Sequence, residues 1–302
     1  MTSPRLATDS PFGRLYRHPG TPAQSLPGVE ESLARGLLVP SVTNVIGCLD
    51  KPFLTSWYGK LAAEDAVDTV RKHPGLIESK PRAAVDWLKH AGHRRLTAAA
   101  ALGDEVHTAV EQLALGEAAV YSEQAAPYVE SWRKFVADFR PEFLHLESTC
   151  FGVVDDPLAG PLGYAGTADF IARVNGVVVT GDYKSGRSIH SEAALQLAAL
   201  ANARELVLPD DTLAAVPAVE AGLVVHLTPT GYAVRQSAAH GLPWHLFGTL
   251  RRVWDFHVAN LEARGPLLMS SPLPGPERVG AAQPSGSQLT SGLLQLPDPA
   301  GA

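Results

Sequence analysis

An Asn-Gly pair between two runs of β-branched residues constrains this chain more than any other feature. Asn175 and Gly176 separate the segments YAGTADFIARV and VVVTGDYK. A two-residue type I′ turn needs positive φ at both central positions, which Asn-Gly accepts readily. The pattern therefore predicts a tight hairpin. If these two residues form its loop, counting outward along the strands places Asp169 directly opposite Asp182.

Two carboxylates that face each other across a hairpin need compensation. Directly opposite Cβ atoms lie about 4.5 to 5.5 Å apart, and like charges there destabilise a sheet. A divalent cation is the simplest candidate, because Mg²⁺ is bound by one or two carboxylates together with substrate phosphate oxygens. Lys184 follows Asp182 by two positions and shares its face, so its ammonium could orient water or neutralise charge on a phosphate. The alternative is a surface ion-pair ladder, which most Asp-x-Lys tripeptides form.

Three further polar residues could complete such a site. His107 shares a helical face with Gly103 and Glu111, and a neutral imidazole could ligate a metal, although a lone helical histidine is more often a hydrogen-bonded, half-buried residue. Gln196 lies on the helix that follows, where it could hold the lysine or a bound water; a solvent-facing glutamine is the ordinary case. Glu147, on the preceding strand, could reach the same end of the sheet or be structural.

The pattern of the whole chain predicts an α+β fold, with a mixed central β-sheet flanked by helices and a helical N-terminal part. Helical periodicity comes first, a meander of β-rich segments follows, and helix and strand then return. Strands are predicted at 144–154, 164–174, 177–184, 222–229 and 232–237, and helices at 94–115, 127–139, 191–207 and 243–263. We expect three regions: a flexible segment at 1–38, the folded domain at 39–263, and a disordered tail rich in Pro, Gly and Ser at 264–302.

Composition limits the classes of function. The formal net charge is −6 and the pI is about 6.0, whereas nucleic-acid-binding proteins usually show a basic patch. Between Arg71 and Arg95, seven Lys or Arg residues accompany two Asp or Glu residues, so this segment is either a phosphate-contacting surface or a solvated helical face. The two cysteines, Cys48 and Cys150, cannot form a four-thiolate cluster. No run is long enough to span a bilayer, so we expect a soluble, cytoplasmic protein of a bacterium or a phage-infected cell.

Four motifs follow one another in the order of a known family: Gly103 to His107 on a helix, Gly166 to Asp169 on a strand, DYKSG from Asp182 to Gly186, and Gln196 on the next helix. Together they resemble the RecB-like nucleases of the PD-(D/E)XK superfamily, in particular the phage and CRISPR-associated exonuclease branch. The PSVT segment from Pro40 to Thr43 also looks like phage members of this group.

The resemblance implies a restriction-endonuclease-like fold with a site for Mg²⁺ or Mn²⁺. The metal ligands it implies are His107, Asp169, Asp182 and the carbonyl of Tyr183. Its implied catalytic residues are Asp169, Asp182, Lys184 and Gln196, with the lysine assisting the nucleophile. No iron–sulfur cluster is expected, because relatives that carry one use four cysteines.

The expected activity is metal-dependent hydrolysis of DNA phosphodiester bonds by an exonuclease in recombination, repair or phage DNA processing. DNA is the expected partner, a membrane is not, and the oligomeric state is open. Two alternatives are a nuclease-fold DNA-binding module that has lost catalysis, and a phosphodiesterase that uses the same carboxylates on RNA or a small molecule.

Overall fold

The predicted hairpin forms at the centre of the larger of two sheets. In the computed structural model, both residues of the Asn-Gly turn have positive φ, 50° and 84°. They join two strands, β5 (Gly160–Val174) and β6 (Val177–Lys184). The antiparallel register begins with the two valines that flank the turn and runs to Phe170 opposite Gly181. The predicted turn and register are confirmed over this ladder.

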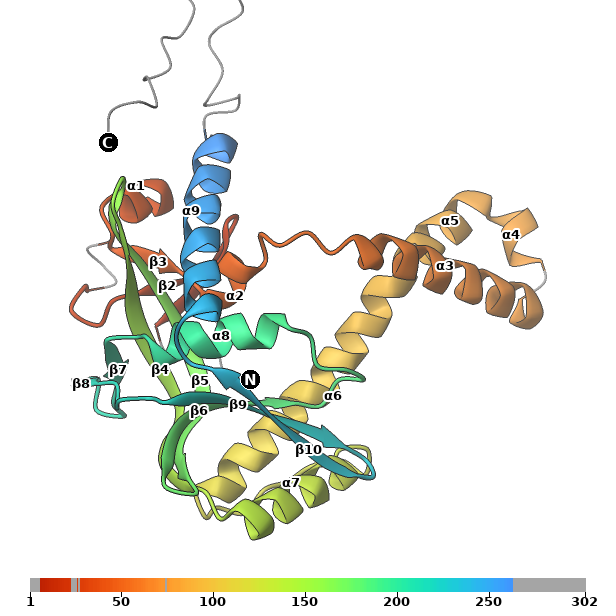
Figure 1. The fold of residues 1–302 in the computed structure, drawn as a ribbon. Helices are drawn as coiled ribbons and strands as arrows, with labels where there is room; N and C mark the ends of the chain where they lie inside the picture. Colours follow the sequence, from red (N-terminus) through yellow and green to blue (C-terminus); the bar gives the residue numbers. More distant parts are fainter. Residues whose placement is uncertain (1–5, 23–25, 27, 74, 263–302) are drawn as a thin grey trace, which may run out of the picture. The chain divides into compact units, whose positions relative to one another are not determined.

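The hairpin belongs to a seven-stranded mixed sheet with the order β10-β9-β6-β5-β4-β7-β8 (Figure 1). Neighbouring strands are antiparallel except β6 and β9, which are parallel. A parallel pair needs a crossover connection, and the chain between β6 and β9 forms one that contains helix α8 (Glu192–Ala201). The remaining strands are β4 (Glu142–Asp156), β7 (Glu205–Val207), β8 (Leu213–Ala215), β9 (Ala221–Thr228) and β10 (Gly231–Ala238). The predicted α+β class with a mixed, helix-flanked sheet is confirmed.

Helices cover both faces of this sheet. On one face, Val106 of α6 and Phe135 of α7 belong to the same buried cluster as Val225 of β9. On the other face, Leu197 of α8 packs with Val224, because successive strand residues point to opposite sides. Helix α8 is shorter than predicted, since residues 205–207 form strand β7, in which Glu205 and Leu206 pair with β4, instead of continuing the helix. The bounds are α6 (Ala91–Ala114), α7 (Ala126–Phe139), α8 (Glu192–Ala201) and α9 (Leu242–Glu262).

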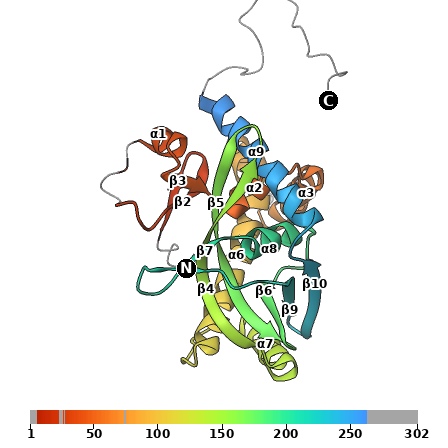
Figure 2. The same ribbon diagram turned by 60° about the vertical axis from the view of Figure 1, so that its left-hand side comes forward.

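A second, three-stranded sheet has its first two strands within residues 1–38, the segment for which the sequence predicted no fold. Its strands are β1 (Ala7–Ser10), β2 (Gly13–Arg17) and β3 (Leu38–Pro40), all antiparallel. This sheet lies beside β5 (Figure 2). Its residues Leu15 and Tyr16 are buried. Strands β1 and β2 are too short and polar to show a period of two in the sequence. The sheet is held by the pairing of β2 with β3, which is distant in the sequence. Two short helices follow β2 and β3, α1 (Val29–Ala34) and α2 (Val42–Ile46).

Three further helices that pack with one another precede α6: α3 (Pro52–Lys72), α4 (Leu76–Ser79) and α5 (Pro81–Lys89). Of these, α3 and α5 also pack with α6. They include part of the basic segment noted in the sequence. Arg94 donates to Asp65 of α3 at 2.6 Å, and Arg95 lies 3.5 Å from Glu64. Acidic residues of α3 therefore pair with these two arginines, and the choice between a phosphate-contacting surface and a solvated helical face stays a prediction for the segment as a whole.

The structure describes residues 6–22, 26, 28–73 and 75–262. The chain divides into two units, Met1–Val258 and Ala259–Ala302, and the elements named above belong to the first apart from the end of α9. The predicted disordered tail at 264–302 lies outside the described residues. Within the described part, no helix has both the length and the apolar character that crossing a bilayer requires.

Candidate functional site

The two predicted aspartates converge where the β5–β6 ladder ends. The last paired residues are Phe170 and Gly181, so the next step outward brings Asp169 level with Asp182. Asp169 Oδ2 accepts the backbone N–H of Tyr183 at 2.7 Å, which ties the carboxylate to the neighbouring strand. The register therefore places the two aspartates level with each other on neighbouring strands, as counting from the Asn-Gly turn predicts.

Lys184 and Gln196 both bind the same oxygen of Asp182. Lys184 Nζ donates to Oδ1 at 2.7 Å, and Gln196 Nε2 donates to it at 3.1 Å. Lys184 shares a face with Asp182 as its spacing predicts, and α8 turns Gln196 toward the sheet and not to solvent. Two donors on one oxygen restrict rotation of the carboxylate and fix the direction in which its other oxygen points.

That other oxygen is the clearest sign that a ligand belongs here. Asp182 Oδ2 is buried and has no hydrogen-bond partner among the described residues. Burial, followed by the nearby Asp169, raises the pKa of Asp182 to about 6, although Lys184 and His107 act in the opposite direction. A buried carboxylate oxygen without a partner is costly, and a bound cation would satisfy it.

Helix α6 brings His107 against the same strand end. His107 Nε2 donates to the backbone carbonyl of Tyr183 at 2.8 Å, and its Nδ1 lies 3.4 Å from Asp169 Oδ2. A Cβ at Gly103, one turn earlier, would lie 3.3 Å from Ser185 Oγ, so glycine permits this close approach. The carbonyl of Tyr183, which the resemblance implies as a metal ligand, is here the acceptor of the His107 hydrogen bond.

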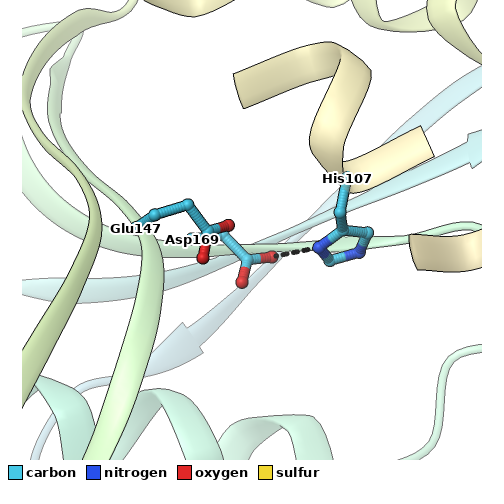
Figure 3. Close-up of side chains that lie close together, drawn as sticks. All are labelled: His107, Glu147 and Asp169. Carbon is cyan, nitrogen blue, oxygen red and sulfur yellow. Dashed lines mark ion pairs between the residues drawn. The ribbon is translucent and has the colours of Figure 1, made fainter. Parts of the chain in front are cut away.

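Glu147 joins His107 and Asp169 in a three-residue group that could hold a metal ion. Their candidate ligand atoms all lie within 4.8 Å of one another (Figure 3). Glu147 is on β4, between the pairs Leu146–Phe170 and Ser148–Ala168, and therefore level with Asp169. Its φ of 41° is unusual for a strand residue. The sequence left open whether Glu147 reaches the site, and its backbone conformation could not be foreseen from the strand pattern.

These residues open into a cleft of about 940 Å³. Its acidic lining includes Glu111, which lies one turn after His107. The pKa of Glu111 is raised by burial, then by Glu117 and Asp169. Burial, then Asp169, Glu111 and Asp182, raises the pKa of Glu147 to about 8. Such mutual repulsion among carboxylates is relieved when they share a cation.

The donor set favours a hard divalent ion. Carboxylates suit Mg²⁺ and Mn²⁺, and imidazole accompanies them in many sites. The chain has two cysteines, of which Cys150 is fully buried, so it cannot supply a four-thiolate cluster. The group His107, Glu147 and Asp169 could therefore hold a metal ion.

Comparisons with known proteins do not name a family. No protein-family model matches the chain, and no curated protein matches it. Among solved structures, the crystal structure of SSO0001 matches with 17% sequence identity over 68% of this chain and 86% of that chain, at a TM-score of 0.33.

Proposed function

We propose that this chain is a Mg²⁺- or Mn²⁺-dependent deoxyribonuclease of the PD-(D/E)XK type. The observation that carries the proposal is the meeting, in one cleft, of the group His107, Glu147 and Asp169 with the hydrogen-bonded set of Asp182, Lys184 and Gln196. The order of these motifs along the chain supports a RecB-like, exonuclease-type member that acts on DNA in recombination, repair or phage DNA processing.

The side chains divide the work of phosphodiester hydrolysis. A divalent ion at this cluster supplies Lewis acidity toward a phosphate and lowers the pKa of water. Asp169 would hold the ion together with His107 and Glu147, while Asp182 Oδ2 points unpaired from the neighbouring strand. Hydrogen bonds hold the carboxylates of Asp169 and Asp182 in place before substrate arrives, which favours catalysis by positioning.

Lys184 is placed to act on the reacting phosphate. Its side chain is about one-third exposed, in contrast to the buried side chain of Asp182 that it binds. It can therefore donate to water or to a phosphate oxygen while it stays bonded to Asp182. Gln196 shares that acceptor oxygen and limits the positions that the carboxylate and the lysine adopt together.

A cleavage assay on full-length protein tests this function. End-labelled linear DNA and closed circular DNA are incubated with Mg²⁺ or Mn²⁺, and wild type is compared with Asp182→Ala and Lys184→Ala. Lys134→Ala, an exposed lysine on α7, is the matched control. We expect metal-dependent cleavage by wild type and the control, and a loss of at least about 100-fold in both site variants.

The outcomes separate the alternatives. Undiminished cleavage by both site variants would remove the assigned site. DNA binding without cleavage by wild type would support the inactive DNA-binding module instead. Cleavage of RNA or of a small phosphodiester, but not of DNA, would move the activity to another substrate class. Digestion of linear but not circular DNA would support an exonuclease.

A further inference from the structure

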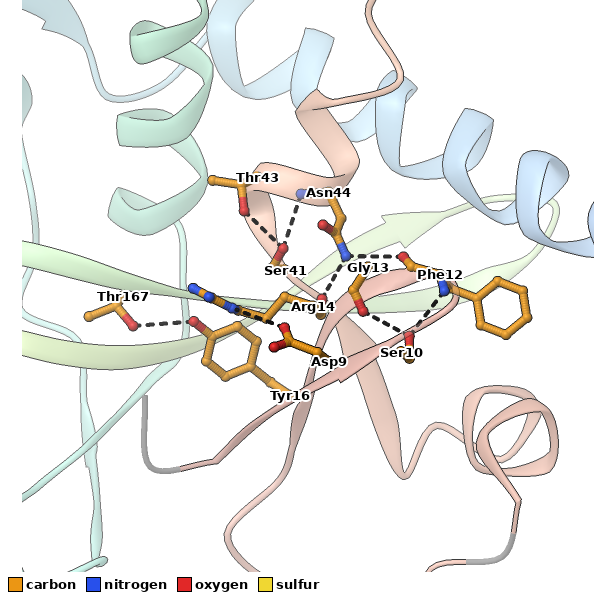
Figure 4. A network of polar contacts seen from close by, with 10 residues as sticks. All are labelled: Asp9, Ser10, Phe12, Gly13, Arg14, Tyr16, Ser41, Thr43, Asn44 and Thr167. Carbon is orange, nitrogen blue, oxygen red and sulfur yellow. Dashed lines mark hydrogen bonds and ion pairs between the residues drawn. The ribbon is translucent and has the colours of Figure 1, made fainter. Parts of the chain in front are cut away.

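The cleft has a second wall that the proposed chemistry does not use. Strand β2 contributes Arg14 and Tyr16, which lie two positions apart and so share a side of the strand. The Tyr16 hydroxyl lies 3.3 Å from Thr167 Oγ1 (Figure 4). Thr167 precedes Asp169 by two positions on β5 and therefore faces the same cleft. The small N-terminal sheet thus places an arginine and a tyrosine hydroxyl beside Thr167, which lies on the strand of Asp169, a candidate metal ligand.

Hydrogen bonds hold Arg14 at this position. Its carbonyl accepts the backbone N–H of Ser41 at 3.0 Å and Asn44 Nδ2 at 2.7 Å. The neighbouring Gly13 has φ +85°, and a Cβ there would lie 2.5 Å from the Asn44 amide. The segment PSVTN, which the proposed chemistry leaves unexplained, therefore fixes the backbone of the hairpin that carries Arg14.

The charges in the cleft explain why such an arginine is needed. Among the described residues that line the cleft, Arg14 and Lys184 are the two Lys or Arg side chains, and five are carboxylates: Asp104, Glu111, Glu147, Asp169 and Asp182. Lys184 is bonded to Asp182. Apart from a bound metal ion, Arg14 is therefore the one Lys or Arg side chain among the described lining residues that can meet a polyanionic substrate without being bound to a buried acid.

Arg14 keeps its guanidinium available. Its ion pair with Asp9 spans 3.7 Å between two well-exposed side chains, an arrangement that contributes little. The guanidinium lies beside the Tyr16 hydroxyl. Burial raises the pKa of Tyr16, against the effects of its hydrogen bond to Thr167 and of the nearby Arg14. Tyr16 therefore stays a neutral hydrogen-bond donor beside the arginine.

We propose that Arg14, Tyr16 and Thr167 bind the phosphate next to the one that is cleaved. A guanidinium fork matches phosphate oxygens, and hydroxyls of Tyr and Thr commonly donate to nucleic-acid phosphates. Thr167 and Asp169 are about 6 to 7 Å apart along the strand, so both sites can be reached by one nucleic-acid strand. The inference rests on the proposed function and narrows its substrate to a strand with consecutive phosphates, bound without regard to base sequence.

Equilibrium binding tests the subsite without requiring cleavage. A fluorescein-labelled single-stranded oligonucleotide is titrated with full-length protein in EDTA and in Ca²⁺, and anisotropy gives the Kd at several salt concentrations. We expect Arg14→Gln to weaken binding about 10-fold or more and to reduce the slope of log Kd against log salt by about 0.7. Tyr16→Phe should weaken binding less and leave that slope as it is.

Arg35→Gln is the matched control, because it removes the same charge from an exposed position at the C-cap of α1. It should bind as wild type does. Equal weakening by Arg14→Gln and Arg35→Gln would overturn the subsite, as would an Arg14→Gln variant with the affinity and salt slope of wild type. The thermal unfolding midpoint of Arg14→Gln is measured as well. A midpoint close to that of wild type would show that the variant keeps the fold.

A second substrate separates this inference from the nuclease itself. Thymidine 5′-(p-nitrophenyl phosphate) has one phosphodiester and cannot occupy a neighbouring phosphate site. In Mn²⁺, Arg14→Gln should lower kcat/KM at least about 10-fold more for the oligonucleotide than for this small diester. The difference should arise from a higher KM for the oligonucleotide. Equal losses on both substrates would overturn the subsite. If wild type cleaves neither, the nuclease proposal fails, and the binding data still decide the role of Arg14.

Discussion

Replacing Glu147 by glutamine should stabilise the metal-free protein at pH 8 while weakening its metal binding. Burial, then repulsion from Asp169, Glu111 and Asp182, raises the pKa of Glu147 from 4.5 to about 8. That difference corresponds to roughly 5 kcal/mol, at about 1.4 kcal/mol for each pH unit. Neighbouring acids share the repulsion and relax when one of them is protonated, so we expect the substitution to recover about 2 to 4 kcal/mol.

The dependence on pH follows from where the proton is bound. The folded, metal-free protein keeps the Glu147 proton up to about pH 8, whereas the unfolded chain releases it near pH 4.5. Folding therefore takes up a proton in this window, and the free energy of unfolding of wild type falls as pH rises through it. Glutamine does not titrate, so the advantage of the variant should be small at pH 4.5 and largest at pH 8.

Urea unfolding in EDTA at a series of pH values measures this difference. Glu130→Gln, an exposed glutamate on α7, controls for the loss of one negative charge. Adding Mn²⁺ should reverse the order of stability, because the variant lacks one carboxylate ligand for the ion. Equal stability of wild type and Glu147→Gln at pH 8, or a difference that stays constant between pH 4.5 and 8, would refute the reasoning.

Three other substitutions test the hairpin and the metal group. Gly181→Ala should lower the free energy of unfolding by about 3 kcal/mol, because its Cβ would come within 1.8 Å of the buried Phe170 ring. Gly176→Ala should cost about 1 to 2 kcal/mol in the same urea assay, since φ is +84° and nothing lies within 4 Å of its Cβ; a larger loss than for Gly181→Ala would contradict the packing argument. Mn²⁺ at 100 times its Kd should raise the free energy of unfolding of wild type by about 2.7 kcal/mol. Asp169→Asn should lose most of that gain in calorimetry, and an undiminished gain would exclude Asp169 as a ligand.

The relative positions of Asp169, Asp182 and Lys184 could be predicted, because all three residues belong to one hairpin. A type I′ turn fixes the register, and the register fixes which side chains oppose one another. Counting outward from Asn175-Gly176 was therefore enough to bring Asp169 and Asp182 together. The period of two then placed Lys184 beside Asp182, as the 2.7 Å contact between them shows.

Residues from distant elements could not be placed by counting. The helical spacing of His107 and Gln196 predicted which neighbours share their faces, but not which strand those faces meet. That depends on how α6 and α8 pack on opposite sides of the sheet. The N-terminal sheet was missed for a related reason, because β2 is held by pairing with the distant β3 and by contact with β5.

Glu147, Asp169 and Asp182 form a row of carboxylates across three strands, and this row itself argues for a bound cation. It lies level with Asp169 on one side, and Asp182 lies level with Asp169 on the other, so three adjacent strands present a row of carboxylates. Like charges on neighbouring strands are destabilising. In addition, Glu147 has a positive φ, a backbone conformation that strand residues avoid. Packing alone gives no reason to keep these three acids, since neutral amides of similar shape would remove the repulsion. An ion bound among them converts the repulsion into ligation, and stability is then expected to be lowest in the metal-free protein above the pKa of Glu147.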